Sequence, residues 1–511
     1  MFEAALAGGL LRVFQSLVQA FPTILIGLLV AGVFRRLLGY EATRRLFGGT
    51  SWRAIPQAWA LGMLLPVCSL GVIPVLREMR RAGVSGGALI AFGLTAPLFN
   101  PISILYGLTL ADPLVIFVFS LCSLAIVSVM GLVWDRVFPD PSSGAAPEPP
   151  AVAAGAKRML AVGAAAAREL AGPSATYIAL GLVGVGLLGA FLPPGALQSS
   201  AESNDPWSPL VMTIVALPAY ATPMTAMTQV ASMFQHGNSV GAAFSLLVLG
   251  AGANMGIVAW TVREYGWRRA GLWFSLLTLV VLACAYGVNR PLHPRGVESA
   301  GHTHAFDSYC NAYGPETGEA LSRTAITIRE RTPKHEWWGL ATLFGVGLVG
   351  VVLNLRDRDG RLEAWLERPS EARPRYDLDL PRSVIGGAAL TGLVAFSVFG
   401  CFVYYPPVED ILTDLQAVNA EVVSSASTKD WDNALLWIPI YDDWTRKLEV
   451  SVVLRGGKMT EEQLMKAKLL RDKLEMLEHE VEDREVDEAK KLADEVRVAY
   501  RQLRSTFPSR N

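Results

Sequence analysis

The chain alternates long apolar stretches with short polar breaks, a pattern typical of a polytopic α-helical membrane protein. A helix needs about 20 apolar residues to cross the hydrocarbon core of a bilayer. Eight stretches reach that length, near residues 14–34, 85–110, 113–134, 174–192, 238–262, 270–288, 337–354 and 383–404. We therefore expect an all-α fold with eight membrane crossings as the coarse count.

Two further apolar stretches, 54–76 and 208–234, are interrupted by helix-breaking and polar residues. The breaks fall at Pro66 with Cys68, Ser69 and Gly71, and at Pro218 with Thr222 and Pro223. A helix of about 12 residues rises only about 18 Å, so neither half of such a stretch can cross alone. Each stretch either crosses once with a kink or enters the bilayer and returns as two half-helices.

The interrupted stretches belong to an internal repeat with an offset of 154 residues. Six positions of the first copy recur in the second, namely Gly27, Gly32, Gly83, Gly87, Ala88 and Asn100 as Gly181, Gly186, Gly237, Gly241, Ala242 and Asn254. A duplicated module with broken membrane helices is typical of secondary transporters, whose substrate site lies where the broken segments meet.

The charges around the two interrupted stretches differ. Arginines 35, 36, 44, 45 and 53 precede the first stretch and arginines 77, 80 and 81 follow it, so both flanks are expected to be cytoplasmic. Glu202 and Asp205 precede the second stretch, and Gln235, His236 and Asn238 follow it, as expected of external flanks. This favours two re-entrant hairpins and inverted repeats. Ten full crossings with parallel repeats remain the alternative.

The predicted organisation has six parts. They are a first permease repeat (1–135), a Pro- and Ala-rich linker (136–157), a second repeat (158–288), a polar external loop (289–336), two additional transmembrane helices (337–405) and a soluble helical bundle (406–511). In the bundle, apolar residues recur at helical intervals among dense charges, and Thr460 with Glu461 and Glu462 marks the start of a long third helix. Eight crossings from an external N-terminus place this bundle on the extracytoplasmic side of the cell (inner) membrane.

Composition agrees with a membrane protein and narrows the function. Hydrophobic residues make up 51% of the chain and charged residues 18%, with a mean hydropathy of +0.34. The net charge of −1 provides no basic surface, so we expect no nucleic-acid partner. The sequence has no GxxxxGK[ST], HExxH or GxSxG motif, so we expect neither ATP hydrolysis nor another enzymatic activity, and no cofactor.

Candidate substrate-binding residues lie at the breaks. At the first tip, unwinding frees backbone carbonyls beside Cys68, Ser69, Gly71 and Pro74, which is tolerated in a bilayer only next to protein or a water-filled cavity. Asn100 and Asn254 carry amides at equivalent broken positions, and Thr222 lies at the second tip. The alternatives are helix capping for the asparagines and a simple buried thiol for Cys68.

A second candidate site lies in the polar loop, in the run HTHAFDSYC. His302, His304 and Cys310 offer imidazole and thiolate ligands, which suit zinc, copper or trivalent arsenic. The alternative is a polar loop with incidental histidines.

The first tip and the helix after it resemble a known family. The stretch LPVCSLGVIPVLREMRRAGVSGGALIAFGLTAPLFNPISIL is similar to the YraQ-type predicted permeases, which include ArsP-like organoarsenical and heavy-metal efflux permeases. At the positions of the family pattern, Cys-Ser-Cys-Gly with Ile-Pro and then Gly-Pro-x-x-Asn-Pro, this chain has Cys68, Ser69, Gly71, Ile73, Pro74, Ala96, Pro97, Asn100 and Pro101. Leu70 replaces the family's second cysteine, so a site with two thiolates cannot form at this tip.

The resemblance covers roughly residues 10–290 and implies efflux of a thiophilic metal or metalloid species. We therefore expect a secondary permease that works by alternating access. Its expected partners are the lipid bilayer and a small inorganic or organometal substrate, which binds around Cys68, Ser69, Asn100, Thr222 and Asn254. The alternative is a membrane-anchored metal or ligand sensor, or an assembly factor, that uses the C-terminal bundle.

Overall fold

The computed structural model describes residues 2–49, 53–137, 146–149, 152, 156–294, 303–314, 317–357, 360–368 and 381–507. These residues form helices, turns and connecting segments without a strand, which confirms the all-α prediction for them. The chain divides into two compact units. The membrane unit comprises Met1–Ile104 and Leu114–Ser397, and the C-terminal unit comprises Leu105–Pro113 and Val398–Asn511.

Residues 2–289 contain two series of helices, which belong to the membrane unit except for Leu105–Pro113. The first consists of α1 (Phe2–Val33), the π-helical η1 (Phe34–Leu38), α2 (Gly39–Leu46), α3 (Ala54–Leu64), α4 (Val72–Arg81), α5 (Gly86–Thr95), α6 (Pro101–Leu110) and α7 (Pro113–Val137). The second consists of α8 (Ala156–Leu170), α9 (Pro173–Phe191), α10 (Ser208–Ala216), α11 (Pro223–Gln235), α12 (Val240–Ser245), η3 (Leu246–Ala251), α13 (Met255–Tyr265) and α14 (Trp267–Asn289). Helices α10, α12, α13 and α14 begin 154 residues after α3, α5, α6 and α7, at 208, 240, 255 and 267 against 54, 86, 101 and 113.

Five helical stretches among the described residues are long and apolar enough to cross a membrane. They are Phe2–Leu46, Pro113–Val137, Pro173–Phe191, Trp267–Asn289 and Lys334–Arg356, with Val240–Tyr265 as a sixth if its 56° bend is counted within one span. The apolar stretch 85–110 is divided, because α5 and α6 are separate helices on either side of the expected break at Asn100. The crossing expected at 238–262 is likewise bent, between η3 and α13.

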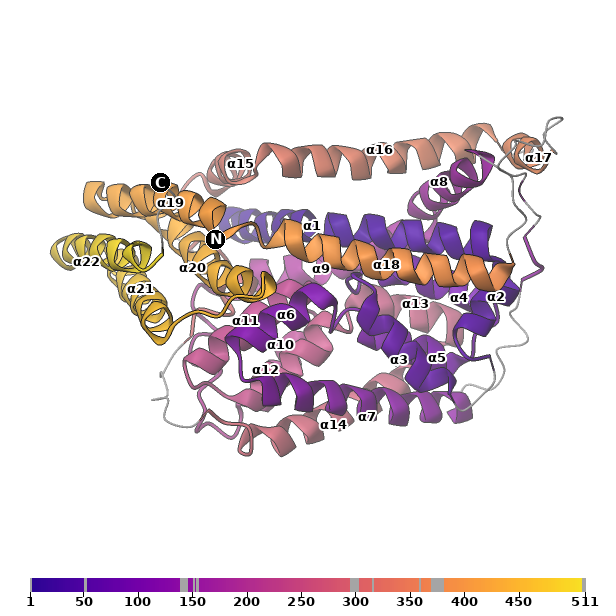
Figure 1. Cartoon of the computed structure of the whole chain (residues 1–511), viewed down its shortest axis with the longest axis horizontal. Helices are drawn as coiled ribbons and strands as arrows, with labels where there is room; N and C mark the ends of the chain where they lie inside the picture. Colours follow the sequence, from indigo (N-terminus) through magenta and orange to yellow (C-terminus); the bar gives the residue numbers. More distant parts are fainter. Residues whose placement is uncertain are drawn as a thin grey trace. The chain divides into compact units, whose positions relative to one another are not determined.

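The interrupted stretches 54–76 and 208–234 are each two short helices. Helix α3 ends just before Pro66 and α10 just before Pro218, because proline cannot donate the backbone hydrogen bond that would continue the helix. Both second halves end alike, at Gly83 (φ 72°) after α4 and at Gly237 (φ 62°) after α11, in the left-handed region that favours glycine. Figure 1 shows α3, α4 and α5 near one end of the membrane unit and α10, α11 and α12 near the other.

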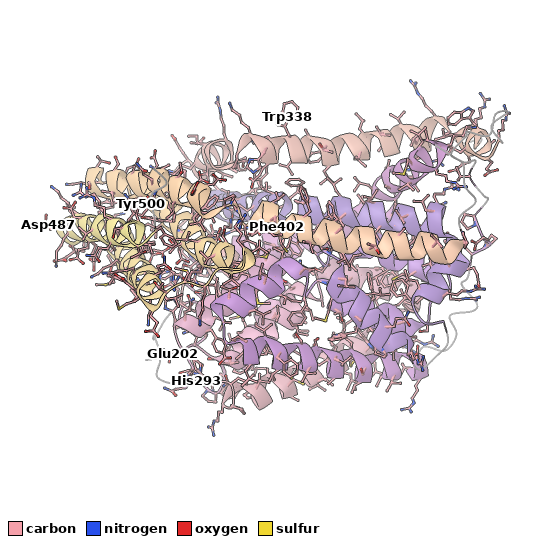
Figure 2. All side chains as sticks on the ribbon, in the orientation of Figure 1. Glu202, His293, Trp338, Phe402, Asp487 and Tyr500 are labelled. Carbon is pink, nitrogen blue, oxygen red and sulfur yellow. The ribbon has the colours of Figure 1, made fainter. Side chains whose placement is uncertain are left out.

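The segment predicted as a polar loop is partly helical. It contains a short 3₁₀ turn (Asp307–Tyr309) and α15 (Ala320–Arg331), which packs against α1. Helix α16 (Lys334–Arg356) follows, packed on α8, and then α17 (Arg361–Glu367). The outer face of α16 is apolar and exposed, with Trp338 75% exposed and pointing away from the other helices (Figure 2), as expected of a lipid-facing surface.

Helix α18 (Arg382–Tyr404) leads into the C-terminal unit, where four helices share one hydrophobic core. These are α19 (Val408–Thr428), α20 (Trp431–Leu454), α21 (Glu461–Glu482) and α22 (Val486–Ser505). The start signal at Thr460 is confirmed, since Thr460 and Gln463 form a capping box. The long third helix is present as α21, which has 22 residues, and Arg484 (φ 58°) separates it from a fourth helix, α22.

Candidate functional site

The breaks in the helices meet inside the membrane unit. We call residues 65–71 and 217–222 the first and second tips. The phenol of Tyr220 on the second tip lies beside the thiol of Cys68 on the first, and both belong to one buried cluster. The Ala221 N–H donates to the Gly250 carbonyl (3.1 Å), which ties the second tip to η3. The sequence-predicted meeting of the broken segments is therefore present at these residues.

Glycines let α1 and α9 approach the first tip closely. A Cβ atom on Gly27 of α1 would lie 1.9 Å from the Gly71 carbonyl oxygen. A Cβ atom on Gly71 would lie 2.3 Å from the Thr23 carbonyl oxygen. The equivalent glycine of α9 is Gly181. A Cβ atom on Gly181 would lie 2.4 Å from Cδ2 of Leu70 and 3.0 Å from Oδ1 of Asn254. Both members of this repeated glycine pair thus serve close packing at the centre.

Cys68 is completely buried in an apolar environment. Its neighbours in the cluster include Ile24 and Leu28 of α1 and Ile178 and Leu182 of α9. The thiol sulfur accepts a hydrogen bond from the Gly71 N–H (3.4 Å). The two tips therefore present one thiol, with a phenol beside it, to a thiophilic ligand.

Asn100 and Asn254 both cap the second half of a broken helix. The Asn254 Oδ1 accepts from the backbone N–H groups of Gly256 (2.7 Å) and Ile257 (3.0 Å) at the start of α13. The Asn100 Oδ1 accepts from the Ser103 N–H (2.8 Å) at the start of α6. Capping is therefore confirmed for both asparagines, and it explains why α5–α6 and η3–α13 are discontinuous.

Three polar atoms at the centre are buried and have no hydrogen-bond partner among the described residues. They are the hydroxyl oxygens of Ser69 and Tyr220 and the amide nitrogen Nδ2 of Asn254. Buried polar groups normally have partners, so these atoms could bind a ligand that enters the centre.

Thr222 and Pro74 have local roles at the two tips. The Thr222 hydroxyl accepts from the Thr225 N–H (3.1 Å) and so caps α11, and the Thr225 hydroxyl donates to Gln19 of α1 (3.0 Å). Pro74 is buried in the first turn of α4, where its missing N–H costs nothing.

The described part of the predicted metal loop is fastened to the membrane unit. The Arg12 guanidinium of α1 donates to the carbonyl oxygens of Cys310 (2.8 Å) and Asp307 (2.6 Å). The His304 Nδ1 lies 2.8 Å from the Asp307 carboxylate. Burial, with some help from Asp307, raises the pKa of the Cys310 thiol. His302 lies outside the described residues, so a metal site formed by the three residues stays a prediction.

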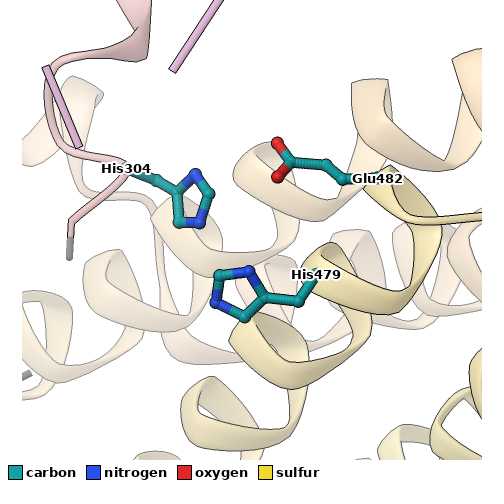
Figure 3. A group of neighbouring side chains, drawn as sticks. All are labelled: His304, His479 and Glu482. Carbon is teal, nitrogen blue, oxygen red and sulfur yellow. The ribbon is translucent and has the colours of Figure 1, made fainter. Parts of the chain in front are cut away.

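The C-terminal unit carries further potential ligands that the sequence reasoning did not single out. His479 and Glu482 lie three residues apart in the last turn of α21, and Figure 3 shows both side chains on that helix.

A buried group of charges at the end of α4 was also missed. Glu78 is 2% exposed, and Glu169 at the end of α8 is 6% exposed. The Arg77 Nε donates to Glu169 (2.6 Å), and Arg81 pairs with Glu78 and reaches Glu169 at 3.5 Å. The sequence signal is the run Arg-Glu-Met-Arg-Arg (77–81), in which a glutamate lies among the arginines that indicate the cytoplasmic side.

The two carboxyl groups, which lie outside the candidate spans, have opposite pKa shifts. Burial raises the pKa of Glu78, Glu169 adds to the rise, and Arg81 and Arg35 offset it only in part. Burial acts on Glu169 too, but the Arg77 charge, the Ser174 hydroxyl (2.7 Å) and Arg81 outweigh it and lower the pKa. Carboxyl groups whose pKa values are driven apart in this way are common at functional sites.

Comparison with known proteins gives two matches. The model of a family described as a predicted permease, ArsP_1, matches residues 7–289. The UPF0718 protein YcgR of Bacillus subtilis (strain 168) is 32% identical over 127 residues, which are 24% of this chain and 43% of that protein. The chain thus matches less than half the length of this relative. No solved structure matches the chain.

Proposed function

The chain belongs to the predicted permease family, and we propose that this membrane permease exports a thiophilic metal or metalloid species by alternating access. The proposal includes two inverted repeats in the cell (inner) membrane. Coupling to an ion gradient drives the export, since the sequence has no phosphate-binding loop for ATP.

Matched hydrogen bonds support the repeat. In the first copy the Gly87 N–H donates to Asp135 (2.7 Å) and the Ala88 N–H donates to Ser85 (3.3 Å). In the second copy the Gly241 N–H donates to Asn289 (2.9 Å) and the Ala242 N–H donates to Ser239 (3.2 Å). The four positions recur 154 residues later, with Gly, Ala and Ser unchanged and Asn289 in place of Asp135. The placement of α3–α5 and α10–α12 near opposite ends of the membrane unit (Figure 1) supports the inversion of the two copies.

The single observation that carries the proposal is the contact between the two tips. Cys68 belongs to the helix pair α3–α4 at one end of the membrane unit, and Tyr220 belongs to α10–α11 at the other. Withdrawal of either pair would open the same thiol to one side of the membrane. Cys68 is 0% exposed here, so this conformation is closed to both sides.

The surroundings of Cys68 favour an organometal species with an apolar group. Leu70 replaces a second thiol, so the tip can offer one metal–sulfur bond. The aliphatic side chains of α1 and α9 suit an organic substituent, and the free polar atoms of Ser69 and Asn254 can bind hydroxyl groups on the metal.

Export by cells tests the proposal. Cells with and without the protein are loaded with arsenite, methylarsenite, copper or zinc, and the retained metal is measured. We expect lower retention with the wild type for at least one species, loss of this effect in Cys68→Ala and Asn100→Leu, and normal amounts of each variant in the membrane. Cys122→Ala on α7 is the matched control and should export normally. Normal export by both Cys68→Ala and Asn100→Leu would remove this site.

One observation favours a second function. The family match ends at residue 289, so residues 398–511 of the C-terminal unit lie outside it. This unit, which we place on the extracytoplasmic side, could bind a ligand in a membrane-anchored sensor or assembly factor. Deletion of residues 406–511 separates the two functions, because a permease should keep measurable export and a sensor should lose all response.

A further inference from the structure

The helices that follow the two tips differ in charge. Arg77, Glu78 and Arg81 of α4 correspond, 154 positions later, to Ala231, Ser232 and Gln235 of α11. The first of these helices therefore carries a buried ionic group, and the second carries neutral residues at the same positions. A shared scaffold does not require these charges, so they are candidates for a role in the transport cycle.

The two buried carboxylates have unequal sets of donors. Glu169 receives hydrogen bonds from Arg77 (2.6 Å) and the Ser174 hydroxyl (2.7 Å), and Arg81 lies 3.5 Å away. Glu78 pairs with Arg81, and the Tyr40 hydroxyl donates to it over 3.3 Å. Arg81 is thus shared between the two carboxylates. Glu78 is the more deeply buried of the pair, and the shared Arg81 is the main group that offsets the cost of burying its negative charge.

The elements around α4 supply few other charges. Tyr40 of α2 and Arg35 of η1 act on Glu78, as does Glu169 from the end of α8. Helix α5 has no titratable residue, and the one titratable residue of α9 is Tyr177. The charged residues of α1 are Glu3 and Arg12, near its other end. Of the two carboxylates in this cluster, Glu78 is therefore the one whose negative charge is stabilised less by its neighbours.

We propose that Glu78 is the proton-binding group that couples this permease to a proton gradient, an inference that rests on the proposed function. A proton from the aqueous phase adds to the Glu78 carboxylate, which becomes a neutral carboxylic acid. Arg81 then loses its partner on α4 and keeps Glu169 on α8. Because Glu78 and the first tip belong to the same hairpin, this change alters how firmly α4 and Cys68 are held in the closed state.

A direct test detects the proton without any substrate. Infrared difference spectra of the purified full-length protein are recorded between buffers of about pH 6 and about pH 9, both above the range in which exposed carboxyl groups titrate. We expect a carbonyl band of a protonated carboxylic acid that Glu78→Gln lacks and Glu169→Gln keeps. Glu41→Gln, at a partly exposed glutamate on α2, is the matched control and should keep the band. A band that is unchanged in Glu78→Gln would overturn the assignment of the proton to Glu78.

A second test separates coupling from transport. Proteoliposomes that contain the wild type are given methylarsenite and a pH difference of one unit, which can drive about tenfold accumulation per coupled proton. We expect Glu78→Gln to lose this accumulation and to keep exchange of methylarsenite between equal concentrations at equal pH. A merely structural role would lower exchange and accumulation together.

The failures of the two proposals are distinguishable. If the wild type moves methylarsenite but ignores the pH difference, proton coupling is overturned and the permease proposal stands. If the wild type exchanges none of the four species used above, the proposed function fails, and the infrared band still decides whether Glu78 binds a proton.

Discussion

The helix pairs α3–α4 and α10–α11 share a scaffold but differ in their electrostatics. Both pairs are broken at a proline, end at a glycine with positive φ and meet at Cys68 and Tyr220. Only α4 continues into the buried cluster of Glu78 and its arginines. The two helix pairs therefore share their backbone geometry at the tips, which must fit together. They differ in charge at the ends of α4 and α11, which lie away from the centre.

The largest effect expected on stability comes from the charged pair. Arg77→Ala leaves Glu169 buried without its main partner, which should cost about 3–5 kcal/mol of unfolding free energy. Thermal unfolding in detergent measures this. The double variant Arg77→Ala/Glu169→Gln should recover most of the loss, because no unpaired charge remains. A single variant as stable as the wild type would show that this pair does not hold α4 and α8 together.

The next effect distinguishes the two copies of a repeated glycine. A Cβ on Gly27 meets a backbone oxygen at 1.9 Å, whereas one on Gly181 first meets the flexible end of Leu70 at 2.4 Å. Gly27→Ala should therefore cost about 1–3 kcal/mol, and Gly181→Ala should cost less. Unfolding midpoints of the two variants, measured in parallel, check the order. The reverse order would contradict the packing of the first tip against α1.

The helix caps should behave equally in the two copies. Asp135→Ala and Asn289→Ala each remove one acceptor for a backbone N–H at the start of α5 or α12. We expect each to cost about 1 kcal/mol. Asp135→Asn, which imitates the second copy, is the control and should be nearly neutral. Very unequal losses would show that the two copies do not share this scaffold.

The smallest effect is a pH dependence with opposite sign for the two carboxyl groups. The pKa of Glu78 is raised by folding, so its contribution to stability is present at low pH and is lost as pH rises through the folded pKa. Glu78→Gln should therefore gain stability relative to the wild type as pH rises. The pKa of Glu169 is lowered, so its contribution is present at neutral pH and is lost as pH falls.

Glu169→Gln should accordingly be less stable than the wild type at neutral pH, and the difference should close in acid. Unfolding curves between about pH 4 and about pH 8 test both signs, since this range includes the usual titration of carboxyl groups. Parallel trends in the two variants would contradict the division of roles within the cluster.

Much of the fold could be predicted from the sequence, because prolines and apolar periodicity act locally. The breaks at Pro66 and Pro218 and the start of α21 at Thr460 follow from residues next to each other in the chain. The break of α22 from α21 at Arg484 could not be predicted, because no glycine or proline marks it.

The site was only partly predictable. The repeat indicated which broken segments meet, so Cys68 and Asn254 were identified. Tyr220 and the Glu78–Glu169 cluster were missed, because their roles depend on contacts between residues that are 91 to 152 positions apart. In a sequence, an arginine near a membrane segment indicates topology. Its buried ion-pair partner can be identified only from the three-dimensional structure.

Labelling from outside the cell tests the inverted arrangement most directly. Cysteines are introduced at Arg53, before α3, and at Glu202, before α10, both exposed positions, and intact cells are treated with a membrane-impermeant maleimide. The wild type measures the background from the five native cysteines. We predict labelling at 202 in intact cells and at 53 only after the cells are opened. Labelling of both positions from the same side would contradict the account.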